Sequence, residues 1–188
     1  MRDLELRGAG NIMGAQQHGH MESVGYDMYL KLLGEAVSEE KGEAAPQSAD
    51  LDCLIDISVN AHIPESYVES LTLRLDVYRR IADIRNKEDS LDVKDELKDR
   101  FGEIPESVLG LIDIALIRNC ANAMGIYEIR QTDTNVLLFV KEIKSPKVIE
   151  LLSRLNGRAM LSAGNKPYIT IRCGGGSSLD MLKKVFKI

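Results

Sequence analysis

The side chains best suited to chemistry gather in residues 1–20, where arginine and glutamine are interspersed with glycine. An arginine guanidinium is a charged fork that fits a carboxylate or a phosphate, and a glutamine amide both donates and accepts hydrogen bonds. Glycine serves where the backbone must reach positive φ or approach another group closely. We call Arg2, Arg7, Gly8, Gly10, Gly14, Gln17 and Gly19 of this segment the candidate motif.

This glycine-rich segment lacks the side chains of the known phosphate-binding loops. Gly14 and Gly19 have the spacing of a P-loop, but His20 and Met21 stand where lysine and serine or threonine are required. The dinucleotide-binding pattern also fails, because Met13 occupies the position of its third glycine. We therefore expect no nucleotide site of either kind and no cofactor in this chain.

Other combinations of reactive side chains are too sparse for catalysis or metal binding. His18 and His20 form a pair, but two histidines without a third ligand do not make a structural zinc site. Asp95 and Glu96 lie within a predicted helix among lysines, which is typical of a solvated helix face. The chain is predicted to be neither an enzyme nor a metal protein by itself.

Composition predicts a cytoplasmic protein with an acidic body. The first twenty residues are neutral, so the rest of the chain carries the whole net charge of −5. Duplex DNA is bound largely by lysines and arginines that neutralise phosphates, so any DNA contact is expected in the first segment. The three cysteines lack CxxC spacing and are expected to be buried thiols, and no apolar run reaches the roughly 20 residues of a membrane span.

The candidate motif is predicted to precede a helix and a linker. Apolar side chains recur at helical spacing over residues 21–40, and residues 38–50 are charged, small and proline-containing. We predict three parts: the tail of a larger domain over 1–20, a connecting helix and linker over 21–50, and a folded domain over 51–188. A glycine-rich loop so near residue 1 also predicts that the chain is a fragment.

The folded domain is predicted to be α+β, helix-rich, with one or more small antiparallel sheets. Alternation over 51–61 predicts a strand, and helical spacing predicts helices over 66–86, 90–101 and 106–124. The second of these helices has Leu91, Val93, Leu97 and Phe101 as its apolar positions and ends at Gly102. The third is apolar on nearly every side and is predicted to be central. A hairpin (126–131 and 136–141), a helix to 155, strands over 159–162 and 168–173, and a helix over 178–187 follow.

Basic side chains line the polar side of the predicted helix over 66–86. Arg74, Arg79 and Arg80 are candidates for a basic face that docks a partner. The alternative, which we favour, is an ordinary solvated face with Glu69 and Asp76 nearby.

Two parts of the chain resemble a known family. The string from Arg2 to Asn11, continued by Gly14 and Gln17-His18-Gly19, is similar to the signature that closes the second motor domain of bacterial transcription-repair coupling factors. Branched-DNA helicases carry a near copy, with proline in place of Ala9. The strings over 73–82 and 99–105 look like the C-terminal domain of the coupling factor and not of those helicases. The resemblance covers most of residues 2–140, and nothing is carried over to the last 45.

The resemblance implies a role for the candidate motif. In the family this segment belongs to the translocation motif, which couples the nucleotide state to movement along duplex DNA, while ATP and magnesium bind elsewhere in the parent motor. Arg2, Arg7 and Gln17 match the polar positions of that motif. The alternative is a structural one, in which these side chains cap helix ends and the glycines permit tight turns. We favour coupling.

The resemblance also implies a regulatory role for the residues after about 50. In the family the C-terminal domain packs on the N-terminal domain of the same protein, as a latch. It masks the surface that recruits the excision-repair damage-recognition ATPase until a stalled RNA polymerase is engaged. The parent would be an ATP-dependent DNA translocase, a hydrolase, that removes the polymerase and recruits nucleotide excision repair. The competing hypothesis for this chain is an autonomous nucleic-acid-binding module.

Overall fold

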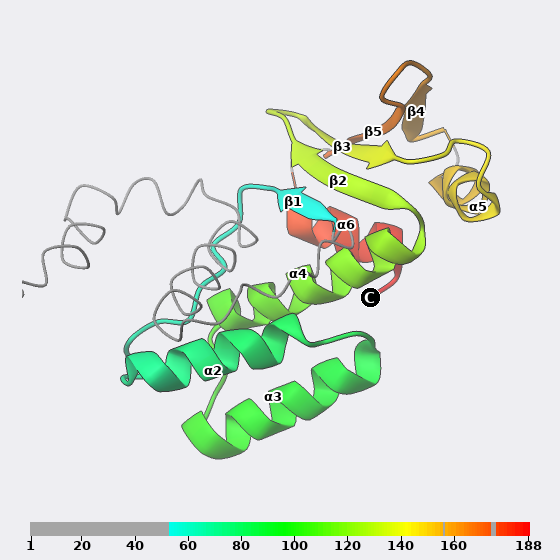
Figure 1. Ribbon diagram of the computed structural model, residues 1–188. Coiled ribbons are helices and arrows are strands. Elements are labelled where there is room, and N and C mark those ends of the chain that lie inside the picture. The colour runs from blue at the N-terminus through cyan, green and yellow to red at the C-terminus, as the bar shows by residue number, and fades with distance from the viewer. Residues whose placement is uncertain (1–52, 156, 174–175) are drawn as a thin grey trace, which may run out of the picture.

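The computed structural model describes residues 53–155, 157–173 and 176–188. These residues form five helices and five strands (Figure 1). In chain order they are β1 (Leu54–Asp56), α2 (Leu71–Ala82), α3 (Lys87–Phe101), α4 (Glu106–Ala123), β2 (Ile126–Gln131), β3 (Asn135–Val140), α5 (Pro146–Leu155), β4 (Ala159–Ser162), β5 (Tyr168–Arg172) and α6 (Ser178–Phe186). The predicted α+β class is confirmed, and every element after α4 lies within two residues of its predicted position. Among the described helices none is long and apolar enough to cross a membrane.

The described strands form one mixed sheet in the order β1-β2-β3-β5-β4. The pairs β2–β3, β3–β5 and β5–β4 are antiparallel, as predicted for β2–β3 and β5–β4. The first pair differs, because β1 runs parallel to β2 with Ile55 opposite Ile129. Three helices separate these two strands in the chain, and a crossover of that length permits parallel pairing where a short turn does not.

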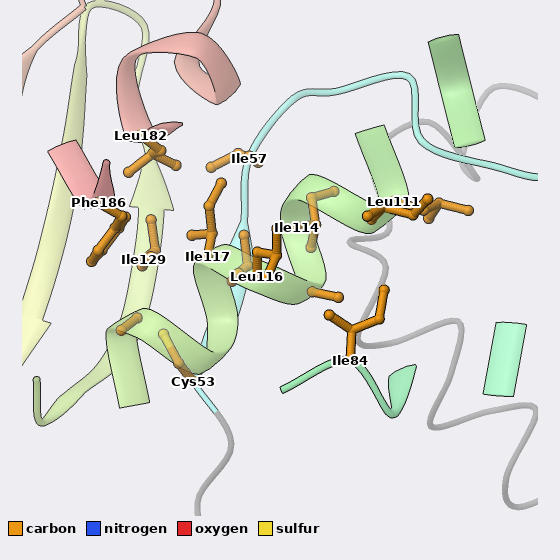
Figure 2. Close-up of a cluster of buried hydrophobic side chains, with 14 of the residues drawn as sticks. Cys53, Ile57, Ile84, Leu111, Ile114, Leu116, Ile117, Ile129, Leu182 and Phe186 are labelled. Atoms are coloured by element: carbon orange, nitrogen blue, oxygen red, sulfur yellow. The ribbon is translucent and has the colours of Figure 1, made fainter. Parts of the chain in front are cut away.

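Helix α4 occupies the centre of the core, as its uniformly apolar sequence predicted. Leu111, Ile112 and Ile117 have no exposed surface. Figure 1 shows the sheet and α6 on one side of α4, with α2 and α3 on the other. In Figure 2, side chains of α4 lie among Ile57, Ile129, Leu182 and Phe186 on one side and Ile84 on the other. A helix enclosed between two layers must be largely apolar. Its polar residues Asp113, Arg118 and Asn119 each bond to a neighbouring part of the fold.

Helix α2 begins later than its sequence pattern predicted. Pro64 opens a turn, in which its carbonyl accepts hydrogen bonds from the amides of Tyr67 and Val68. The helix starts after Ser70, whose hydroxyl accepts a hydrogen bond from the Leu73 amide. The prediction of a helix from residue 66 is therefore wrong. The apolar residues of the preceding turn have helical spacing without forming a helix. The helix begins where the Ser70 side chain caps its first turn.

Helix α3 begins earlier than predicted, at Lys87. Asn86 and Asp89 form a reciprocal capping box in which each side chain accepts a hydrogen bond from the other's backbone amide. The buried stripe then consists of Ser90, Val93 and Leu97, whereas Leu91 is 59% exposed. The assignment of Leu91 to the apolar face is wrong. Gly102 ends the helix at φ +86°, as predicted.

The C-terminal part of the chain belongs to the same core. Strand β5 lies inside the sheet between β3 and β4, and Ile169, Leu182 and Val148 are completely buried. Lys183 on α6 forms a 2.6 Å ion pair with Asp113 on α4. The Arg154 guanidinium on α5 donates to the Val185 carbonyl on α6. Residues 146–188 therefore complete the domain.

Candidate interaction surface

The candidate motif at the N-terminus lies outside the described residues. This holds for Arg2, Arg7, Gly8, Gly10, Gly14, Gln17 and Gly19, for the predicted helix over 21–40 and for the linker. Both interpretations of the candidate motif, coupling to movement along DNA and a purely structural role, therefore stay predictions.

The three candidate docking arginines all lie on α2, but they do different things. Arg74 is mostly covered, with 12% of its side chain exposed. Its guanidinium donates to the carbonyls of Val68 (3.0 Å) and Glu69 (3.3 Å) and to the Glu65 carboxylate (2.9 Å). These bonds join α2 to the turn that precedes it. Arg74 is therefore occupied within the domain, and the geometry gives it a structural task.

We expect replacement of Arg74 to destabilise the fold and replacement of Arg79 to leave it unchanged. Arg74→Gln leaves the partly buried Val68 carbonyl without its charged donor, which costs about 1–3 kcal/mol. Arg79 is half exposed, and its 3.5 Å pair with Asp76 is long, so Arg79→Gln should change stability by less than about 0.5 kcal/mol. Urea denaturation of both variants checks this. Equal unfolding midpoints would contradict it.

Arg80 and Arg100 share one carboxylate between α2 and α3. Glu96 accepts from Arg100 at 2.8 Å and from Arg80 at 3.2 Å. The Arg100 hydrogen bond, assisted by that of Arg80, holds the pKa of the Glu96 carboxyl below its usual value against the opposing effect of burial. About half of each arginine side chain is exposed. This charged ridge, consisting of Arg80, Glu96 and Arg100, fits the solvated-face interpretation and keeps positive charge available at the surface.

The depressed pKa of Glu96 predicts a pH-dependent contribution to stability. A carboxyl whose pKa is lower in the folded state stabilises the fold above its unfolded value, near 4.5, and that contribution disappears as pH falls through the folded pKa. Glu96→Gln should therefore be less stable than the wild-type chain at neutral pH, by less than about 1 kcal/mol, and equally stable in acid. Urea denaturation at several pH values measures the difference.

Glu103→Gln is the matched control for this measurement. The Glu103 side chain is 92% exposed, and its ion pair with Lys98 is 3.7 Å long. Its replacement should leave the stability profile unchanged at every pH. A loss from Glu96→Gln that did not vary with pH would show that the carboxylate charge contributes nothing.

Reactive groups do not converge in the described part of the chain. No group of three or more His, Cys, Asp or Glu side chains that could hold a metal ion occurs there. Cys53 is buried and Cys120 and Cys173 are half-buried free thiols, and burial raises the pKa of Cys120. A hollow of about 350 Å³ lies between the end of α4 and the start of α5, where Lys147 donates to the Ala123 carbonyl. The residues that line it are Ala123, Met124, Gly125, Lys141, Glu142, Ser145, Pro146 and Lys147.

The second face of the sheet carries side chains that the sequence interpretation left unassigned. Helices lie against the face that contains Ile55, Ile129 and Leu138 (Figure 1). On the other face, Phe139 has ring contacts with Tyr127 and Tyr168, at centroid distances of 6.1 and 5.5 Å. We call this the open sheet face and define it by Leu54, Tyr127, Glu128, Arg130, Leu137, Phe139, Met160, Tyr168 and Thr170. The alternation of β2, β3 and β5 was the signal that could have located it.

The fold defines the class of protein: a small α+β domain in which one mixed sheet packs against a central helix. The chain belongs to the TRCF domain family, which matches residues 57–150.

Its relatives carry the name of the longer protein. The chain is 35% identical over 191 residues to a transcription-repair-coupling factor of Bacillus subtilis, covering 98% of this chain and 16% of that protein. It is 38% identical over 152 residues to the Staphylococcus epidermidis protein of the same name, covering 80% of this chain and 12% of that protein. A crystal structure of the C-terminal domain of a transcription-repair coupling factor has the same fold, with TM-score 0.63 and 18% identity over 74% of this chain and 91% of that one. The chain thus spans about a sixth of its B. subtilis relative.

Proposed function

We propose that residues 51–188 are a regulatory interaction domain of a transcription-repair coupling factor and perform no catalysis themselves. The main support is the match to the TRCF domain family, together with 35% identity to a transcription-repair-coupling factor along nearly the whole chain. The parent protein would be a cytoplasmic, ATP-dependent DNA translocase that removes stalled RNA polymerase and recruits nucleotide excision repair. ATP and magnesium would bind in its motor domains.

We further propose that the domain is an intramolecular latch. Its partner would be the N-terminal domain of the same protein, whose surface for the damage-recognition ATPase it would cover. The charged ridge supports this proposal, because Arg80 and Arg100 are held in place by Glu96 and still half exposed. Ordered, half-exposed charges suit an interface that must open again, since such pairs favour orientation more than affinity. Arg79 lies one position away on the same helix.

The competing hypothesis of an autonomous nucleic-acid module receives less support. Arg74 is committed to carbonyls and to Glu65, and Arg79 and Arg80 have acidic partners within 3.5 Å. A duplex would have to displace those carboxylates to reach the guanidinium groups, against a net charge of −5. Fluorescence anisotropy of labelled duplex DNA over a salt series should show no binding by the chain.

A competition titration tests the latch. The parent protein, lacking the part that corresponds to this chain, is mixed with the damage-recognition ATPase, and the chain is added in trans. We expect the apparent Kd for the ATPase to rise with the concentration of the chain. An unchanged Kd would rule the latch out.

Two variants locate the docking surface in the same titration. Arg79→Glu/Arg80→Glu reverses one charge of the ridge and the neighbouring charge on α2, and Lys184→Glu reverses one exposed charge on α6. If the ridge docks the partner, the first variant competes less well than the wild-type chain and the second competes equally. Equal competition by all three would remove the arginines from the docking surface while leaving the latch itself in place.

A further inference from the structure

Strand β4 is an edge strand that lacks the usual protection of edges. It pairs with β5 along one side and ends the sheet that the described residues form. Its residues are Ala159, Met160, Leu161 and Ser162, in a regular register without a bulge. Natural edges are guarded by lysine, proline, inward charges or bulges, because a row of unpaired backbone groups is a template for another strand. Strand β4 contains none of these, and its protection is limited to its short length of four residues.

The opposite edge of the sheet is protected by a charged residue, so the two edges differ. Strand β1 is three residues long and ends at the exposed Asp56. An added strand there would desolvate a carboxylate. At β4 it would instead cover Met160, which is 61% exposed, and Leu161, which is 42% exposed.

The β4 edge is only partly covered in the described part of the domain. Leu161 lies opposite Ile169, whose side chain is completely buried on the helical side of the sheet. Leu161 therefore faces the helical side too, yet it is exposed. Met160 lies opposite Thr170, on the open sheet face. Both faces of the edge are therefore partly accessible in the described part of the domain.

We propose that β4 pairs with β4 of a second copy of this chain, in antiparallel orientation, and joins two sheets into one. In an antiparallel pair, opposite residues point to the same face of the sheet. When a two-fold axis relates the two strands, this is possible only if the axis passes beside one residue, which then lies opposite its own copy. Centring on Met160 sets it against its own copy on the open face, and sets Ala159 against Leu161 on the helical face. The helical row is then apolar, and the open row has Met160 at its centre.

The charges around β4 are compatible with this register. Arg158, the nearest charged residue before the strand, would lie opposite Ser162 of the second copy and not opposite another arginine. Like charges directly opposite each other destabilise a strand pair, and an uncharged hydroxyl does not. The strand of another protein would not necessarily place an uncharged residue opposite Arg158. The sequence of β4 therefore favours a second copy of this chain as the partner strand.

The association should be weak and dependent on concentration. Only about four residues of each copy would pair. The area that they bury should therefore be well below the roughly 1,200 Å² that stable interfaces bury. In sedimentation equilibrium the average mass should be 20.9 kDa for dilute protein and should rise towards twice that value as concentration increases. Met160→Lys should abolish the rise without changing the unfolding midpoint, because Met160 is largely exposed in one copy.

A cysteine variant tests the register directly. Opposite residues of an antiparallel pair have Cα atoms about 4.5–5.5 Å apart, within the range of about 4.4–6.8 Å that a disulfide spans. Met160→Cys should therefore form a disulfide-linked dimer under mild oxidation, several times more than Leu91→Cys or the wild-type chain. Leu91 is the matched control, since it is 59% exposed on α3. A constant mass of 20.9 kDa at every concentration, or equal crosslinking of the two variants, would overturn the proposal.

Discussion

A chain that ends at Leu155 will not fold. The missing part contains β4, β5 and α6, and with them the buried side chains of Ile169, Ile171, Leu182, Val185 and Phe186. Burial of each such side chain stabilises the fold by about 1.5–3 kcal/mol. The sum is comparable to the whole stability of a typical domain, which is about 5–15 kcal/mol. The truncation also uncovers Leu138 on β3, which pairs with Ile169 in the intact sheet.

Far-UV circular dichroism with urea titration measures this loss. The full chain should unfold in one cooperative transition, and the truncated chain should show none. Lys184→Ala in the full chain is the control, because Lys184 is an exposed residue of the removed helix α6 and its loss should leave the midpoint unchanged. A truncated chain with the midpoint of the full chain would show that residues 53–155 fold alone.

Two leucines of α3 should respond very differently to the same truncation to alanine. Leu97 is 1% exposed and Leu91 is 59% exposed. Leu97→Ala removes buried methyl groups and leaves a cavity between α3 and the rest of the core, which costs about 2–5 kcal/mol. Leu91→Ala removes atoms that already contact water, so its effect should stay within about 0.5 kcal/mol. The local chemistry is otherwise matched, since both positions lie inside one helix.

Urea denaturation of both variants measures the two losses. A shift of the midpoint at an unchanged slope of the transition is a change in the free energy of unfolding. Equal losses would mean that Leu91 is covered in solution, by a second copy or by another part of the chain. A loss from Leu97→Ala below about 1 kcal/mol would mean that the site collapses around the smaller side chain.

The same two leucines show where sequence periodicity stops being informative. Four apolar residues of α3 fit a helical stripe, yet the stripe that is buried includes Ser90 and omits Leu91. Ser90 is tolerated there because its hydroxyl donates to the Lys87 carbonyl. Which side of a short amphipathic helix is buried depends on its cap and on its neighbours, and neither is visible in the spacing of leucines alone.

The candidate docking residues show a similar limit. Helical spacing placed Arg74, Arg79 and Arg80 on the polar side of one helix, and all three do lie on α2. Only the folded chain distinguishes them, because the turn from Pro64 to Glu69 wraps back over Arg74 and the Glu96 carboxylate of α3 meets Arg80. A side chain's task depends on groups that are distant in sequence.

The sequence by itself determined the α+β class, the central position of α4, the β2–β3 hairpin and the family to which the chain belongs. These features follow from local patterns, since apolar periodicity, turn residues and family motifs are contained in short stretches of chain. Only the tertiary structure decided that β1 is parallel to β2, that β5 lies inside the sheet and that β4 is left at its edge. Strand order depends on contacts between segments far apart in the chain, and alternation specifies a strand's faces without specifying its neighbours.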